Sequence, residues 1–496
     1  MAETQAEQGQ KQAQGQGKGQ AQGQGQPQGQ NQAQEKQQGH QAHTRSARLL
    51  PGEREGRRIK VVMLGAGSGF TQPLVTDILN IPSLPGGEIA LVDIDTGRLE
   101  LAHQLVAKLI NIMGKEGSWS VSATTERRQA LRGADYLVNC IEVSGTKAVK
   151  FDYEIPLKYG VDQCIGDTIG PGGLMKALRT IPTWVEVLKD AEEICPQALV
   201  LNYTNPMSMM CLAASKVTKM QVVGLCHSVQ GTSHLLARHA GVPYNEMQWK
   251  CAGINHLAWF TELTHDGRDL YPVLFEKARD HKSEFYQGDP VRCDMMLHFG
   301  AFITESSGHL SEYLPYYRKR KDLMEKYIRS GYRGESGFYA RNWPNWRRGT
   351  DEHRRKAIAG EVEIKTERSW EYASWIIEAH QTNRPFVIHG NVINHGLIDN
   401  LPQGQCVEVA VMVDGNGFNP CRFGELPPQM AAICRSNMAM FELGVIAALE
   451  SSREAAAHAL MLDPLTAAVL SPAEVKQMTE ELIEAELELL PGFQRG

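Results

Sequence analysis

Short aliphatic and β-branched runs alternate with longer amphipathic segments over the first half of the chain. The run at 57–64 stops at a glycine, as a buried parallel strand does before a turn. Because strand and helix patterns alternate, the sequence predicts an α/β fold with a parallel, doubly wound sheet. We expect strands at 57–64, 89–94, 136–142, 198–202 and 221–225, and helices at 72–79, 97–113 and 172–192.

After about residue 245 this alternation gives way to mixed segments. They include a stretch rich in Trp and Arg at 342–355, a helical region around 366–380 and mostly amphipathic helix from 427 to 490. The pattern predicts an α+β substrate domain at 246–496, packed on the carboxyl edge of a sheet domain at 57–245. Ligands bind at that edge in such folds.

The start of the chain differs from the rest in composition. Residues 1 to about 50 repeat Gln, Gly and Ala and contain almost no larger apolar side chains. Such a segment cannot bury enough apolar surface to offset the entropy of ordering. We interpret 1–56 as a disordered tail and assign it no catalytic role.

Composition and charge narrow the class of protein. The 496 residues are 42% hydrophobic and 22% charged, which is typical of a large soluble enzyme. A net charge of −6 argues against nucleic acid and anionic membranes as partners. Charges and glycines interrupt every apolar run, and the start lacks the apolar region of a signal peptide. The ten cysteines form no CxxC pair, so we expect reduced thiols in the cytoplasm.

A glycine-rich turn follows the first predicted strand. Gly-Ala-Gly-Ser-Gly-Phe occupies 65–70, and Asp93 ends the next strand. In a Rossmann-type fold such glycines let the backbone approach a pyrophosphate, and the acidic residue binds the adenosine ribose, which favours NAD over NADP. The motif departs from GxGxxG because its sixth residue is Phe70. We assign cofactor binding to Gly65, Gly67, Ser68, Asp93, Ile94 and Arg98.

Four other segments are dense in chemically useful residues. The glycine-dense turn at 166–173 suits either a ligand or a tight helix entry. Cys226 and His256 follow apolar runs; they could hold a divalent cation with room for sugar hydroxyls, or simply pack. Residues 202–206 end another predicted strand. Residues 304–317 fit acid–base chemistry or a surface loop anchored by tyrosines.

Taken together, these segments resemble glycoside hydrolase family 4 from about residue 58 to 492. Within the family the motifs are most similar to those of its bacterial α-galactosidases (melibiases). The motifs stand at 167–182 (DTIGPGGLMKALRTIP), 224–232 (GLCHSVQGT), 251–256 (CAGINH) and 396–404 (GLIDNLPQG).

The resemblance implies a fold with a C-terminal domain like that of lactate and malate dehydrogenases, and an unusual hydrolytic mechanism. Tightly held NAD takes hydride from C3 of the sugar, and a base removes the acidified C2 proton. A manganese ion bridging O2 and O3 stabilises the enediolate. The aglycone leaves, water adds at C1, and the hydride returns.

The resemblance also implies roles for residues at matching positions. Cys226 and His256 correspond to the manganese ligands, and Asn205 to a group that hydrogen-bonds a substrate hydroxyl. Within the 167–182 motif, Asp167 and Thr168 are assigned to substrate binding. His227 stands where phosphoglycosidase relatives carry the proposed acid for the leaving group.

Tyr313 matches the tyrosine proposed as the C2 base in phosphoglycosidase members. A free tyrosine has a pKa near 10, so this role requires a nearby cation to lower its pKa. Some members use an aspartate a few residues upstream, where this chain has Ser307. His309 and Glu305 are the alternative bases.

The Cys-His-Ser-Val sequence at 226–229 resembles the α-galactosidase subgroup and argues against phosphorylated sugars. α-Galacturonides and α-glucosides remain open as substrates. Two other readings are an NAD-dependent 2-hydroxy-acid dehydrogenase and a non-catalytic NAD sensor. The resemblance further implies a homo-oligomer, either a dimer or a tetramer.

Overall fold

The computed structural model describes residues 53–495. The predicted tail at 1–56 therefore lies outside the described residues, except for its last four positions. Of these four, Arg54 is buried.

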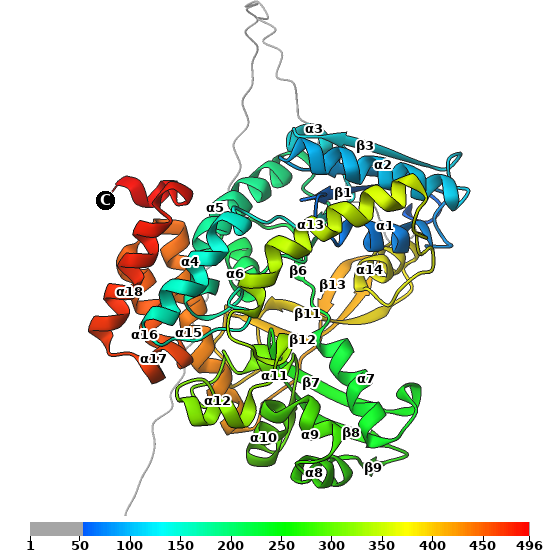
Figure 1. Ribbon diagram of the computed structural model, residues 1–496. Helices are drawn as coiled ribbons and strands as arrows, with labels where there is room; N and C mark the ends of the chain where they lie inside the picture. Colours follow the sequence, from blue (N-terminus) through cyan, green and yellow to red (C-terminus); the bar gives the residue numbers. More distant parts are fainter. Residues whose placement is uncertain (1–52, 496) are drawn as a thin grey trace, which may run out of the picture. The chain divides into compact units, whose positions relative to one another are not determined.

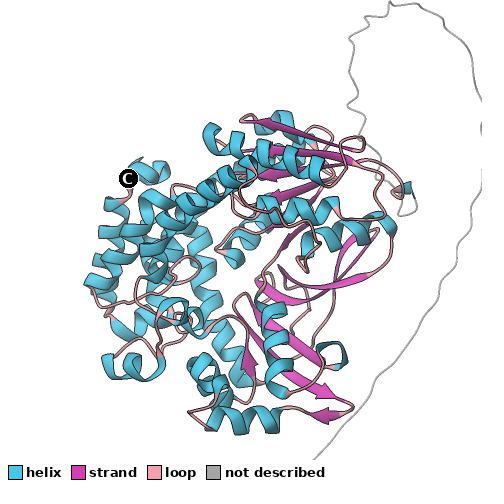
Figure 2. Cartoon of the chain, turned by 45° about the vertical axis from the view of Figure 1, so that its right-hand side comes forward, coloured by secondary structure: helices cyan, strands magenta, loops and turns pink. Residues whose placement is uncertain are grey.

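Six parallel strands form one half of a 13-stranded sheet, in the order β3-β2-β1-β4-β5-β6. This order is that of a doubly wound dinucleotide-binding fold. The chain adds strands outward on one side of β1, from β1 to β3, and then on its other side, from β4 to β6. Helices cover both faces of the sheet, so every one of these strands except β3 at the edge is mostly apolar and buried (Figures 1 and 2). Their bounds are β1 (Ile59–Leu64), β2 (Gly87–Val92), β3 (Trp119–Thr124), β4 (Tyr136–Asn139), β5 (Leu199–Asn202) and β6 (Val222–Gly224).

The predicted doubly wound sheet is thus confirmed, with strand ends that differ by at most three residues. β3 was not predicted. It lies at the edge of the sheet, and most of its side chains are partly or fully exposed, so it lacks the apolar run that marks a buried strand.

The second half of the chain extends the same sheet with antiparallel strands. β11 pairs with β6 through Asn391 and Gly224, and β12, β7, β8 and β10 follow in that order. Strands from both sides of residue 245 therefore belong to one sheet. The division into two domains at this residue stays a prediction. The bounds are β7 (Gln248–Ile254), β8 (Leu257–His265), β9 (Arg268–Asp269), β10 (Phe302–Ile303), β11 (Phe386–Ile393), β12 (Cys406–Asp414) and β13 (Gly417–Pro420).

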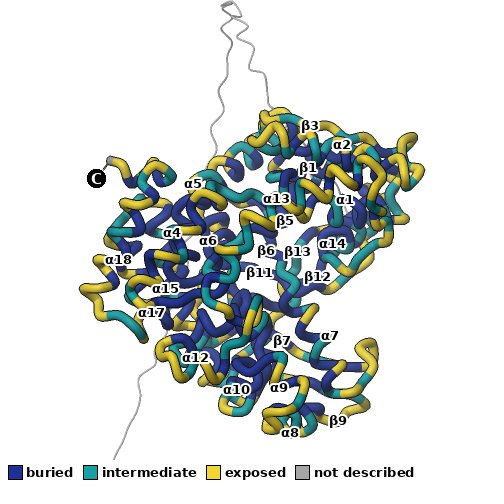
Figure 3. Tube along the Cα trace, in the orientation of Figure 1, coloured by how far each residue is buried: buried dark blue, intermediate teal, exposed yellow. Residues whose placement is uncertain are grey.

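Helices of the first half pack on the parallel strands, which are mostly buried apart from β3 (Figure 3). The longest of these helices, α5, begins in the glycine-dense turn. All of its first twelve residues are buried. The bounds are α1 (Thr71–Leu79), α2 (Thr96–Ile112), α3 (Arg127–Leu131), α4 (Gly145–Lys158), α5 (Gly170–Ile194), α6 (Met207–Val217) and α7 (Ser228–Ala240).

Helices of the second half surround the antiparallel strands and the carboxyl edge of the sheet. The Trp- and Arg-rich stretch lies within one long helix, α13, which packs against α2 and α4. The helix predicted at 366–380 begins later, at Tyr372. The bounds are α8 (Tyr271–Arg279), α9 (Glu284–Gly288), α10 (Pro290–Phe299), α11 (Ser307–Leu310), α12 (Lys321–Tyr327), α13 (Phe338–Ala359) and α14 (Tyr372–Thr382).

The predicted helical end of the chain is confirmed. One of its helices, α15, is long and apolar enough by composition to cross a membrane, although Arg435 and Glu442 interrupt it. In the structure α15 packs against α5, α6 and α16, so its apolar side chains serve the protein interior. The bounds are α15 (Pro428–Glu450), α16 (Arg453–Leu462), α17 (Pro464–Val469) and α18 (Pro472–Ala485).

Candidate active site

A cavity of about 1700 Å³ lies along the carboxyl edge of the parallel strands. It runs from the glycine turn after β1 to the segments that follow β6, β7 and β10. Most predicted site residues line it: Gly65, Gly67, Ser68, Asp93, Ile94, Arg98, Asp167, Asn205, Cys226, His227, His256, Glu305 and His309.

The glycine turn forms the cofactor end of this cavity. Gly65 has φ +75°, and a Cβ there would lie 2.5 Å from the carbonyl oxygen of Cys140, so only glycine fits. The carboxylate of Asp93 accepts hydrogen bonds from the amides of Gly67 (2.7 Å) and Asp95 (2.9 Å). Asp93 therefore fixes the turn, and Ile94, 92% exposed, lies beside it on the cavity wall.

At the other end, three possible metal ligands converge. Cys226 follows β6, His256 lies in the turn between β7 and β8, and Glu305 follows β10. Their ligand atoms all lie within 4.8 Å of one another, with Cys226 Sγ 3.2 Å and the nearest Glu305 oxygen 3.6 Å from His256 Nε2. Thiolate, imidazole and carboxylate form a donor set that suits a divalent transition metal, so the residues fit such an ion.

The charges of this cluster depend on one another. Burial would raise the pKa of the Cys226 thiol, but the His256 imidazole lowers it to about 7. Burial would lower the pKa of His256, but Cys226 and Glu305 raise it to about 10. The pKa of Glu305 lies well below its ordinary value, against burial, because His256 and His309 are near. A cation that binds here displaces the His256 proton and meets two anionic ligands.

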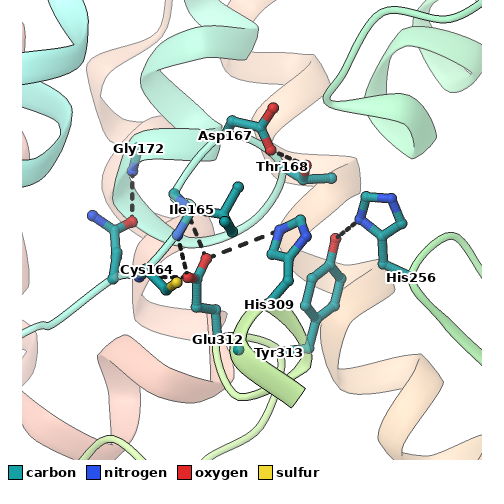
Figure 4. Close-up of polar contacts among 12 residues, drawn as sticks. Cys164, Ile165, Asp167, Thr168, Gly172, His256, His309, Glu312 and Tyr313 are labelled. Carbon is teal, nitrogen blue, oxygen red and sulfur yellow. Dashed lines mark hydrogen bonds and ion pairs between the residues drawn. The ribbon is translucent and has the colours of Figure 1, made fainter. Parts of the chain in front are cut away.

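Two tyrosines support the cluster from opposite sides. Tyr313 Oη lies 3.3 Å from His256 Nδ1, which leaves Nε2 directed at Cys226 (Figure 4). Tyr332 Oη donates to Glu305 at 2.7 Å and lines the cavity. Partners of this kind set the tautomer and orientation of a metal ligand.

The role of Tyr313 as the C2 base stays a prediction. Its side chain is fully buried and does not line the cavity. Its pKa is raised well above 10, first by burial and then by the charges of Asp167 and Glu305.

The predicted substrate-binding residues gather at Asp167, which is paired with a buried lysine. Lys176 Nζ lies 2.9 Å from a Glu142 oxygen and 3.3 Å from Asp167 Oδ2. Burial would raise the pKa of Asp167, but Lys176 lowers it to about 2. Asn205 Nδ2 lies 3.4 Å from the same carboxylate. Thr168 is buried behind Asp167, to which its hydroxyl donates, and does not line the cavity.

The loop that carries Asp167 is held by the segment that carries Tyr313. The buried carboxylate of Glu312 accepts hydrogen bonds from the amides of Cys164, Ile165 and Gly166 at 2.6–3.0 Å (Figure 4). The predicted glycine-dense turn is therefore both a helix entry and part of the cavity wall.

His227 lies at the mouth of the cavity. A ring nitrogen hydrogen-bonds Glu371, and the ring stacks on Phe70 at 5.9 Å. Burial would lower the pKa of His227, but Glu371 raises it above its ordinary value. Phe70, the departure from the glycine motif, thus contributes a ring to the cavity wall.

Family models match almost the whole described chain. The model of the family 4 glycosyl hydrolases covers residues 60–242, and that of the family 4 C-terminal domain covers 251–466. The chain belongs to family 4 of the glycosyl hydrolases.

Relatives within family 4 support this membership. An α-galactosidase of Bacillus subtilis (strain 168) is 38% identical over 445 residues, which cover 88% of this chain and 99% of that protein. An α-galactosidase of Rhizobium meliloti (strain 1021) is 39% identical over 441 residues, or 88% and 89% of the two chains. A 6-phospho-α-glucosidase from gut microorganisms, solved with NAD and Mn²⁺, shares the fold. Its TM-score is 0.73 at 20% identity, over 87% of this chain and 99% of that one.

Several residues of this family 4 site escaped the sequence analysis. Glu305 was named only as an alternative base, although its segment was marked as dense in titratable groups. Glu371 lies in the region predicted as helix at 366–380, and Tyr332 lies in a stretch for which no element was predicted; both are far in sequence from the groups they contact. Ser307, which stands where some family members carry an aspartate, is buried and does not line the cavity.

Proposed function

We propose that this family 4 enzyme hydrolyses α-galactosides with NAD and a manganese ion as cofactors. The observation that carries the proposal is the single cavity that joins a dinucleotide turn to the Cys226–His256–Glu305 cluster. A 2-hydroxy-acid dehydrogenase of the lactate or malate type would need the turn without the cluster, and an ordinary metal hydrolase would need the cluster without the turn. The two α-galactosidase relatives support the substrate class.

Bound NAD would supply a reversible hydride acceptor, and the bound cation would supply positive charge beside two sugar hydroxyls. Cys226, His256 and Glu305 would hold the cation. Asn205 and Asp167 lie where they can hydrogen-bond the sugar. His227, held by Glu371, would donate a proton to the leaving oxygen.

The buried cations of the cavity wall favour a neutral sugar. Lys176 is paired with Glu142 and Asp167, and Arg292 is bound by both oxygens of Asp289 at 2.7–2.9 Å. A phosphate or uronate group would have to compete with these buried carboxylates for the same cations. This pairing supports galactosides over galacturonides and phosphorylated sugars.

We further propose that the enzyme works in the cytoplasm as a homo-oligomer, a dimer or a tetramer. All ten cysteines are free, and a thiolate ligand at Cys226 requires a reducing compartment. The oligomeric state is carried by the family resemblance alone.

The test is the release of p-nitrophenol from its α-galactoside by purified protein, with NAD, Mn²⁺ and a reducing thiol each present or omitted. We expect hydrolysis that requires all three, without net accumulation of NADH. NADH that rises in step with substrate loss would favour the dehydrogenase. Cleavage of the α-galacturonide alone would move the substrate assignment to uronides.

A further inference from the structure

Helix α13 brings a buried arginine to the back of the glycine turn. Arg354 Nη1 donates to the carbonyl oxygen of Gly67 at 2.9 Å, and its Nη2 donates to that of Ser68. The side chain is only 3% exposed and comes from the opposite half of the chain. A charged group buried against a loop of glycines has a cost that only a specific role offsets.

The backbone donors of this turn are largely used within the turn itself. The amide of Gly67 donates to Asp93, that of Ser68 to the carbonyl of Gly65 at 2.9 Å, and that of Phe70 to the Ser68 hydroxyl at 3.3 Å. Among the described residues, only the amide of Gly69 within 67–70 has no protein partner. A pyrophosphate in this groove therefore meets fewer free amides than a dinucleotide turn usually offers.

The planar peptide links Arg354 to that free amide. In a trans peptide the N–H points opposite to the C=O. Because the Ser68 carbonyl is directed at Arg354, the Gly69 N–H of the same peptide is directed away from it, and Gly69 lines the cavity. The Thr71 amide also donates to the Ser68 carbonyl, at 3.2 Å, so the turn and the guanidinium hold this peptide together, and the guanidinium strengthens its dipole with a positive charge from behind.

We propose that Arg354 is a positioning residue for the cofactor pyrophosphate, acting through the peptide between Ser68 and Gly69. This inference rests on the proposed use of NAD. Asp351 places the arginine, since its carboxylate lies 3.8 Å from Arg354 and 3.0 Å from Arg98, which lines the same groove. Asp351 thus links Arg354 to Arg98.

The helix does not depend on Arg354 for its attachment. Lys108 on α2 donates to the carbonyls of Ala357 and Ile358 at 2.9 and 2.7 Å, and α13 packs along α2. An Arg354 variant should therefore retain the helix and lose the contacts with the turn and with Asp351.

The experiment compares ligands that differ in the pyrophosphate. NAD, ADP-ribose and adenosine are titrated into the full-length protein, the first two by calorimetry and adenosine by ligand-observed NMR. In Arg354→Gln we expect about tenfold or more weaker binding of NAD and ADP-ribose, because a charge-assisted contact is lost. Adenosine binding should stay within about twofold of the wild type, because adenosine has no pyrophosphate for the Gly69 N–H to meet.

Two control variants make the result specific. Arg355→Gln removes an exposed arginine from the same helix and should leave all three affinities unchanged. Arg354→Lys keeps the charge without the two-pronged contact and should restore part of the NAD affinity. Unchanged NAD binding in Arg354→Gln, or equal weakening of adenosine, would overturn the proposal. Failure of the wild-type protein itself to bind NAD would instead overturn the proposed cofactor.

Discussion

The two ends of the cavity are built over different distances along the chain. The cofactor end comes from one strand–turn–helix–strand unit, in which Asp93 holds the turn of Gly65 and Gly67. The metal end comes from loops after three strands, two of them antiparallel, and carries Cys226, His256 and Glu305. The residues of a local unit stand together in one short stretch of sequence and form a motif there. The residues of a site built from distant loops stand in separate stretches, and none of these stretches is a complete motif.

The two ends also differ in their electrostatics. At the metal end, buried groups of opposite charge shift one another's pKa values strongly. At the cofactor end, Ile94 is exposed and Asp93 is held by backbone amides. We therefore expect changes at the metal end to abolish turnover without removing the cofactor.

The largest effect should follow the loss of a metal ligand. In Cys226→Ala we expect a kcat about 10³-fold lower, since the cation stabilises several kcal/mol of developing charge. The NAD affinity measured by calorimetry should stay within about twofold, because the glycine turn is not in contact with Cys226. Cys421→Ala, an exposed cysteine, is the matched control. A parallel loss of NAD affinity would break the distinction between the two ends.

The next effect concerns acid stability of the antiparallel half. Burial lowers the pKa of His389 on β11 from 6.5 to about 4, beside Trp249 on β7. Its neutral form contributes stability above pH 6.5, and this is lost as the pH falls towards 4, up to roughly 3 kcal/mol. His389→Phe should therefore flatten the fall in Tm over that window.

Scanning calorimetry between pH 4 and 8 measures this effect. The matched control is His458→Phe, at an exposed position, which should keep the wild-type pH dependence. An identical acid-induced fall of Tm in His389→Phe and wild type would contradict the assignment.

Removal of one hydroxyl should separate two roles for Tyr313. If Tyr313 orients His256, Tyr313→Phe weakens Mn²⁺ binding by about 10- to 100-fold. Saturating Mn²⁺ should then restore most of the turnover. If Tyr313 is the C2 base, Mn²⁺ affinity stays unchanged and kcat collapses at every metal concentration. Mn²⁺ affinity is read by electron paramagnetic resonance, with Tyr316→Phe as the control.

The smallest effect is expected at the cavity mouth. Glu371 raises the pKa of His227, which keeps the histidine protonated as an acid to higher pH. Activity that needs this proton is lost as the pH rises through the pKa of His227. Glu371→Gln should shift that loss to lower pH and reduce kcat a few-fold at pH 8. An unchanged basic limb would contradict this use of Glu371.

The glycine turn at the cofactor end could be predicted because its signal is local: Gly65, Asp93 and the β-branched run before them form a recognisable unit. The Rossmann-type sheet was predicted from the alternation of strand and helix patterns, which is also local, while the binding roles of the residues at this end stay predictions. At the metal end, Cys226 and His256 were identified through the family resemblance, not through their spacing of thirty residues. Glu371, Tyr332 and Arg354 could not be predicted, because each acts through a contact made only after the chain has folded.

The family resemblance implies that hydrolysis proceeds through loss of the proton at C2 of the sugar, and the proposed use of NAD and a cation depends on this step. The most direct test is to hydrolyse an α-galactoside in D₂O with NAD, Mn²⁺ and a thiol, and to analyse the released galactose by NMR and mass spectrometry. We predict one carbon-bound deuterium, at C2. Galactose released at the same rate without deuterium at C2 would contradict the account, because simple displacement at C1 leaves that proton in place.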